Sequence, residues 1–190
     1  INRFMHSYGT ANVFIGSNAG NFTTTGTGLN VGIGDSALTA LTTGSENLGV
    51  GRWALTSLTT GQYNVAVGAN VLRSVTTGRF NTGVGGTVMA LTTAEANTGI
   101  GYGALTLNIT GGSNTAIGVS ALTALDGSGA ANNVAIGRNA GFSHTTGGDN
   151  VFIGHSAGYT ANSQNANTTA SNNTYIGRNA GSQIPTQITN

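Results

Sequence analysis

The chain has 190 residues, of which only 6% are charged, and its formal net charge is +1. Because a typical soluble domain carries about 25% charged residues, this composition excludes the dense basic surface that binds nucleic acid or anionic membranes. There is no cysteine, which excludes disulfides and thiol chemistry, and no apolar run reaches the roughly 18 residues of a membrane span.

A short motif, Asn-x-x-Ile/Val-Gly, recurs ten times along the chain, most often at a spacing of 17 residues. The copies begin at Asn12, Asn30, Asn47, Asn64, Asn81, Asn97, Asn114, Asn133, Asn150 and Asn173. A fixed short period is typical of a solenoid, in which each repeat packs only against its neighbours. We therefore predict an all-β parallel β-solenoid of ten coils over residues 12–181, between flanks at 1–11 and 182–190.

Each repeat begins with a predicted strand, counting its Asn as position 0. Positions 1 and 3 are mostly β-branched, as in Val65 and Val67, while position 2 is Gly or Ala in the middle repeats. This alternation favours a strand with two distinct faces. We expect positions 1 and 3 to form the core, and the small residues at position 2 to face a neighbouring chain.

The rest of the repeat is predicted to turn twice. Position 4 is Gly in all ten copies, which indicates a turn with positive φ. Positions 7, 8 and 11 are apolar, as in Ala54, Leu55 and Leu58. Their spacings of one, three and four residues predict an arc or a short helical turn. Thr-Thr-Gly, as in Thr59–Gly61, then closes the coil as a second turn.

The invariant Asn has two interpretations. Asn is common in turns, but stacked amides also form hydrogen-bonded ladders along a β-stack, at a spacing of about 4.8 Å. Occupancy in all ten copies favours the ladder, since a simple turn also accepts Asp or Ser.

The end repeats differ from the middle ones. Position 2 is aromatic in Phe14, Phe152 and Tyr175, and position 8 becomes Gly in the first copy and the last three. The last interval carries a polar insertion, for which we predict a protruding loop at 161–172.

Two phrases in the repeats carry a resemblance to a known family. Gly-Ser-Asn-Thr-Ala-Ile-Gly at 112–118 and Asn-Asn-Val-Ala-Ile-Gly at 132–137 resemble the head repeats of YadA-like trimeric autotransporter adhesins. The longer unit with Ala-Leu and Thr-Thr-Gly is similar to repeats of phage tail-fibre-like proteins. The resemblance implies a left-handed parallel β-roll, three chains per rod and adhesion to a surface. The adhesin unit is shorter, so the Ala-Leu arc is an addition.

Residues suited to catalysis or metal binding do not converge in the sequence. The three histidines, His6, His144 and His155, fall at different repeat phases, and the five acids form no carboxylate pair or calcium-binding pattern. We therefore expect no enzyme activity, no cofactor and no metal site. Arg52, Arg138 and Arg178 share position 5, either as a solvated column or as a stripe that recognises acidic glycans.

The sequence favours a structural or adhesive fibre segment of a phage tail or head fibre, or of a bacterial surface adhesin. The expected partners are two further copies of the chain and a host-cell surface receptor or glycan, outside the cell, with no nucleic acid and no membrane insertion. Candidate ligand contacts are Tyr159, Tyr175, Arg178 and the polar loop. Six aromatics could form sugar-stacking patches, but we assign them to different phases and therefore expect most to be packed or isolated: Trp53, Tyr63, Phe80, Tyr102, Phe142 and Tyr159. An ice-binding β-solenoid is the alternative function.

Overall fold

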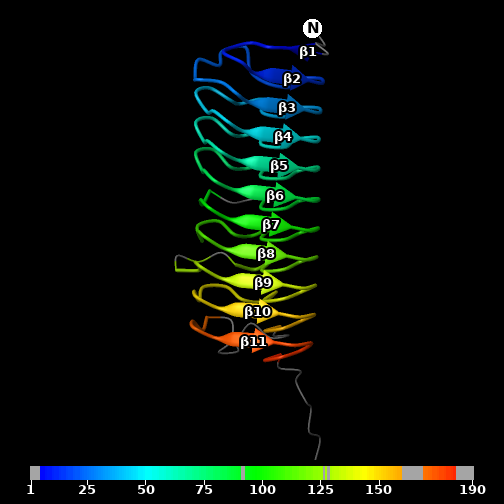
Figure 1. The fold of residues 1–190 in the computed structure, drawn as a ribbon, viewed down its shortest axis with the longest axis vertical. Coiled ribbons are helices and arrows are strands. Elements are labelled where there is room, and N and C mark those ends of the chain that lie inside the picture. Colours follow the sequence, from blue (N-terminus) through cyan, green and yellow to red (C-terminus); the bar gives the residue numbers. More distant parts are fainter. Residues whose placement is uncertain (1–4, 91–92, 126, 128, 160–168, 183–190) are drawn as a thin grey trace, which may run out of the picture.

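A computed structural model describes residues 5–90, 93–125, 127, 129–159 and 169–182, and in these it contains strands and turns but no helix (Figure 1). The strands are β1 Met5–His6, β2 Val13–Ile15, β3 Val31–Ile33, β4 Leu48–Val50, β5 Val65–Val67, β6 Thr82–Val84, β7 Thr98–Ile100, β8 Thr115–Ile117, β9 Val134–Ile136, β10 Val151–Ile153 and β11 Thr174–Ile176. They form one sheet in sequence order.

The repeat period sets the register of this sheet. Strands β2 to β11 pair in parallel, and each residue lies beside the residue at the same repeat position, as Val65 lies beside Thr82 and Val67 beside Val84. The prediction of a parallel β-solenoid with one repeat per coil is confirmed. Strand β1, from the N-terminal flank, pairs antiparallel with β2 and covers that end of the rod (Figure 1).

The segment after each strand is an arc rather than a helical turn. Its residues at positions 6 and 8 have positive φ, as in Trp53 (60°) and Leu55 (53°), which interrupts helical geometry. The arc instead bonds to the next coil, since the Leu55 N–H donates to the Val71 carbonyl at 3.1 Å. Of the two sequence interpretations, the described residues therefore support the arc.

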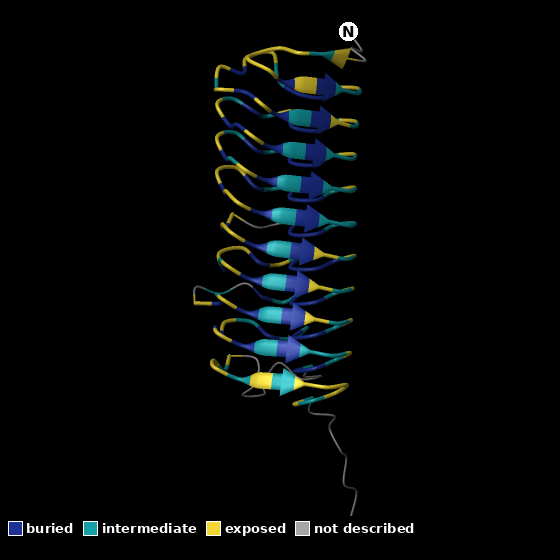
Figure 2. Ribbon diagram, viewed as in Figure 1, coloured by how far each residue is buried: buried dark blue, intermediate teal, exposed yellow. Residues whose placement is uncertain are grey.

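The two faces of the strands are reversed relative to the prediction. Position 2 points into the coil, where Ala66, Ala116 and Ala135 are fully buried, whereas positions 1 and 3 are mostly only partly covered (Figure 2). The reason is the narrow interior: a Cβ added at Gly49 would already lie 3.5 Å from Leu38 Cγ. Small residues at position 2 make room for core side chains of the same chain, many of them from the preceding coil, and not for a neighbouring chain.

The core combines the position-2 residues of the strands with the apolar residues of the arc. Positions 7, 8 and 11 are fully buried in the middle coils, as in Ala54, Leu55 and Leu58, and they join one continuous cluster along the rod. Stacking neighbours is what gives so thin a structure a core.

In three of the end coils the large side chain that fills the interior comes from position 2 instead of position 8. Where position 2 is Phe152, position 8 is Gly158, and a Cβ on Gly158 would overlap the Phe152 ring. Phe14 with Gly20 and Tyr175 with Gly181 repeat this relation. The middle coils up to that of Leu122 combine a small position 2 with Leu or Met at position 8, so one large side chain occupies the shared space, whereas the coil of Ala135 and Gly141 has a small residue at both positions.

The glycine column at position 4 is required by backbone geometry. Gly34 has φ 128°, and a Cβ there would lie 2.7 Å from the carbonyl oxygen of Gly51 in the next coil. Only glycine combines this φ with so close an approach of two backbones.

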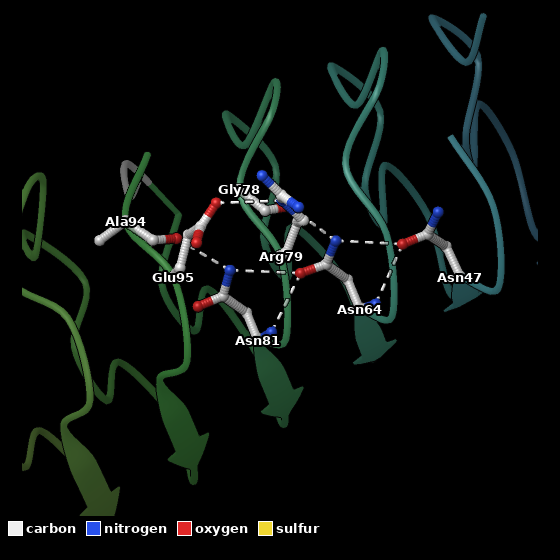
Figure 3. Close-up of polar contacts among 7 residues, drawn as sticks. All are labelled: Asn47, Asn64, Gly78, Arg79, Asn81, Ala94 and Glu95. Carbon is white, nitrogen blue, oxygen red and sulfur yellow. Dashed lines mark hydrogen bonds and ion pairs between the residues drawn. The ribbon is translucent and has the colours of Figure 1, made fainter. Parts of the chain in front are cut away.

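The asparagine ladder is confirmed (Figure 3). Asn64 is fully buried, and its backbone N and its Nδ2 each donate to Asn47 Oδ1 at 3.0 Å. The same Nδ2 donates to the Gly78 carbonyl at 2.9 Å. Asn81 repeats the pattern on Asn64. Each amide thus supplies the donor and the acceptor that join successive coils.

We predict that Asn64→Asp destabilises the fold by at least about 3 kcal/mol, because a carboxylate loses both donated bonds and faces two acceptor oxygens in a buried place. Burial raises the folded-state pKa of the new carboxyl above its unfolded value of about 3.9. Stability is therefore higher below that unfolded pKa and is lost as the pH rises through the folded pKa. Thermal melts at about pH 4 and pH 7 measure this. The matched control is Asn18→Asp, on an exposed asparagine; an equal loss in both variants would contradict the ladder.

We also predict that a double exchange in one end coil is tolerated better than either single change. Phe152→Ala leaves a cavity costing about 3–5 kcal/mol, and Gly158→Leu overlaps the Phe152 ring. Together they recreate the pairing of Ala116 with Leu122, whose φ of 48° shows that leucine accepts this backbone. Urea unfolding of all three variants tests the coupling. Additive losses would show that the two positions do not share one volume.

Candidate interaction surface

The described residues offer no enclosed site for a small ligand. No pocket is found in the described part of the chain, and no three His, Cys, Asp or Glu residues there lie close enough to hold a metal ion. No helix in the described ranges is long and apolar enough to cross a membrane. The candidate functional features are therefore surfaces of the rod.

The largest regular surface is the outward side of the sheet, which we name the outer sheet face. It consists of positions 1 and 3 of strands β2 to β11, two columns of ten residues each. All are Val, Ile, Leu or Thr, so no charged side chain belongs to either column. Isoleucines in it are substantially exposed, with Ile33 at 37% and Ile136 at 39%. Large continuous apolar patches of this kind mark interaction sites.

The flat face is a direct result of parallel, in-register pairing. Because identical positions stack at about 4.8 Å, the β-branched side chains of each column lie in a row along the rod. Three threonines, Thr82, Thr98 and Thr115, are direct neighbours at position 1 of strands β6 to β8, and they give the middle of this face hydroxyl groups.

The residues predicted to contact a ligand do not form one site. Tyr175 occupies position 2, where its ring stacks on Phe152 at a centroid distance of 5.8 Å and packs against the core. Tyr159 lies at position 9, near Phe142. Arg178 is exposed at position 5. Tyr175 thus extends the core stack, while the other two lie on separate columns.

The predicted loop at 161–172 lies mostly outside the described residues. Its last part rejoins the rod, where Ser171 Oγ accepts from the Gly148 N–H at 3.0 Å and the Asn172 N–H donates to the Gly148 carbonyl at 3.1 Å.

The histidines have separate structural surroundings. His144 is buried at position 11, and its Nε2 lies 2.8 Å from the Gly147 carbonyl oxygen and 3.1 Å from Asn150 Nδ2. His6 lies against the rings of Phe14 and Phe22 at the N-terminal end. His155 is exposed. Each belongs to a different part of the rod.

The prediction that these aromatic residues occupy different repeat phases is wrong for two pairs, whose rings lie together. Tyr63 and Phe80 both precede the ladder Asn, and their rings stack at 5.3 Å and 4°. Phe142 and Tyr159 both occupy position 9. A side-chain hydrogen bond between Tyr63 and Glu46, together with the negative charge of Glu46, raises the pKa of Tyr63. Each pair is separated by 17 residues, which is one repeat, and this spacing is the sequence signal that predicts the contact.

A further cluster joins residues from two coils, and sequence phase alone does not reveal it. Arg52 Cζ lies 3.7 Å from the centroid of the Trp53 ring, and Arg73 Cζ lies 4.9 Å from the same centroid. Arg52 Nε also lies 3.9 Å from Asp35 Oδ2. Such exposed ion pairs contribute little stability.

Comparisons of the chain with family models, with curated proteins and with solved structures find no match.

Proposed function

We propose that this chain is a structural and adhesive segment of an extracellular fibre, either a phage tail or head fibre or a bacterial surface adhesin. The observation that carries the proposal is the outer sheet face, an uncharged apolar surface along the whole repeat region. The resemblance of residues 112–118 and 132–137 to adhesin head repeats agrees with this function. A long rod of similar coils suits a part that spaces or presents a binding end.

The outer sheet face is the proposed contact between copies of the chain. A stable interface uses about 20–30 residues on each side, and the two columns together supply twenty. Obligate interfaces are more apolar than other protein surfaces, and these columns hold only aliphatic residues and threonine. The resemblance to adhesin head repeats implies three chains per rod, and three copies around one axis would place each column of a chain against one neighbour, so we propose a homotrimer.

This contact differs from the one inferred from the small residues at position 2. Those residues face the core of their own coil, as Ala66 does. The outward residues at positions 1 and 3 take their place in the proposed interface. Because the core is closed within one chain, a copy separated from its partners keeps its fold.

An ice-binding solenoid is a second candidate, and one observation favours it. The neighbouring threonines Thr82, Thr98 and Thr115 lie on the flat outer sheet face. The other threonine column has its hydroxyls engaged, since Thr42 Oγ1 and Thr59 Oγ1 each donate to a carbonyl of the next coil at 3.0 Å.

Val67→Asp tests the proposed trimer. Val67 lies half-buried on the outer sheet face, so three carboxylates would be buried together at the interface, where unpaired charges are costly. We expect this variant to be a folded monomer by light scattering and circular dichroism at micromolar concentration, while the unmodified chain has the mass of three copies.

Two matched variants separate assembly from folding. Ala66→Asp puts the same charge into the core one residue away and should remove the β-sheet signal altogether. Arg52→Ala, whose side chain is 60% exposed, should leave the mass unchanged. A monomeric unmodified chain, or a trimeric Val67→Asp variant, would refute the proposed interface.

Thermal hysteresis separates the two candidate functions. We expect the purified chain to show no gap between melting and freezing points, because a face buried in a trimer is closed to ice. A hysteresis that disappears in a triple Thr→Val variant at 82, 98 and 115 would favour ice binding over the fibre.

A further inference from the structure

Among the described residues, positive charge and aromatic surface meet around Trp53. The chain has a single tryptophan and six arginines, and two of those arginines contact that tryptophan. Arg52 Cζ lies 3.7 Å and Arg73 Cζ 4.9 Å from the centroid of the Trp53 ring. In a chain with so few charged residues, this arrangement is a distinct local feature.

The cluster lies outside the two residue columns of the proposed interface between copies. Arg52 and Trp53 follow the bend at Gly51, beyond the end of strand β4, and Arg73 lies on the arc of the next coil. Arg52 and Arg73 are exposed, and Trp53 is half-buried. The residue after Arg52 in the position-5 column is Ala69, which is small and leaves the arginines uncovered.

Contact with the indole ring holds the guanidinium groups in place. A guanidinium over an aromatic ring is attracted by the negative ring face. The N–H groups at its edge stay available, and their fork matches the two oxygens of a carboxylate or sulfate. Because these side chains are already ordered, less conformational entropy is lost when a ligand binds.

The local charge is positive but limited. Asp35 is the acid near this cluster, at 3.9 Å from Arg52 Nε, with its side chain 46% exposed. Arg73 makes no ion pair among the described residues. Two guanidinium groups and one carboxylate offer donors for an anion and an acceptor for hydroxyl groups. A ligand that combines single anionic groups with many hydroxyls fits this set.

We propose that Arg52, Trp53 and Arg73 form a binding site for an acidic glycan that bears carboxylate or sulfate groups, with Asp35 accepting a sugar hydroxyl. The site deepens the proposed function, on which it rests, by naming the ligand class and the place on the rod. Nucleic acid is disfavoured because strong binding of a strand needs a series of phosphate contacts, and the rod has no such series of cations. In a trimer, three copies of the site would add avidity.

Because Trp53 is the only tryptophan, its fluorescence reports on the site directly. We would titrate the full chain with oligogalacturonate, which carries carboxylates, with dextran sulfate and with neutral dextran. We expect a saturable change with at least one acidic glycan and none with dextran. Affinity should decrease as salt is added, because the contact is between exposed charges.

Variants assign the binding to these residues. Arg73→Ala should weaken binding about tenfold, the effect of losing a charge-assisted hydrogen bond, and Arg73→Lys should fail to restore it because lysine lacks the planar fork. Arg138→Ala is the control, on an exposed arginine at position 5 of a distant coil, and should bind as the unmodified chain does.

Several results would overturn the site: no saturable signal with either acidic glycan, equal binding of dextran, unchanged affinity in Arg73→Ala, or tighter binding of oligothymidylate. Light scattering on the same samples keeps the two proposals apart. A monomer that binds the acidic glycan retains the site and rejects the trimer, whereas a trimer that does not bind rejects only the site.

Discussion

The hydrogen bonds between buried asparagines hold the coils in register, and the rest of the structure follows from that register. Asn47 Oδ1 accepts two hydrogen bonds from Asn64, and Asn64 Nδ2 also reaches the Gly78 carbonyl in the following coil. An Asp carboxylate has no N–H group to donate, and a Ser hydroxyl has one donor where the Asn amide has two. Among the described residues, the one buried side-chain polar atom without a partner is Asn70 Oδ1, which lies outside the ladder.

Strict register gives every side chain a neighbour of the same repeat position, so each choice of residue affects a whole column. Inside the coil the space beside the strand takes a large side chain either from position 8, as Leu38 lies against Gly49, or from position 2, as Phe152 lies against Gly158. Outside the coil, the same stacking turns scattered β-branched residues into one flat apolar face. The core and the proposed interface between copies are thus two consequences of one period.

The sequence was sufficient for the period, the strands, the turn glycines and the ladder, because each depends on residues that recur at a fixed repeat position. It was not sufficient for the direction of the two strand faces. Alternation shows that Ala66 and Val67 lie on opposite sides, but only the thickness of the coil decides which is inside. The contact between Trp53 and Arg73 also depends on the path of the arc through its positive-φ residues, which propensity does not predict. The pairing of Tyr63 with Phe80 could have been predicted, because the two residues are one repeat apart.

In a solenoid of this kind, uniform positions and exceptional positions have different roles. Residues that stay the same along the chain, such as the glycine and asparagine columns, are constrained by stacking and are poor candidates for recognition. The outer sheet face is uniform and uncharged, which suits contact with an identical copy over its whole length. Trp53, Arg52 and Arg73 are departures from the repeat that stacking does not require. Because hot spots of binding are rich in tryptophan and arginine, such departures are where a repetitive rod acquires a specific ligand.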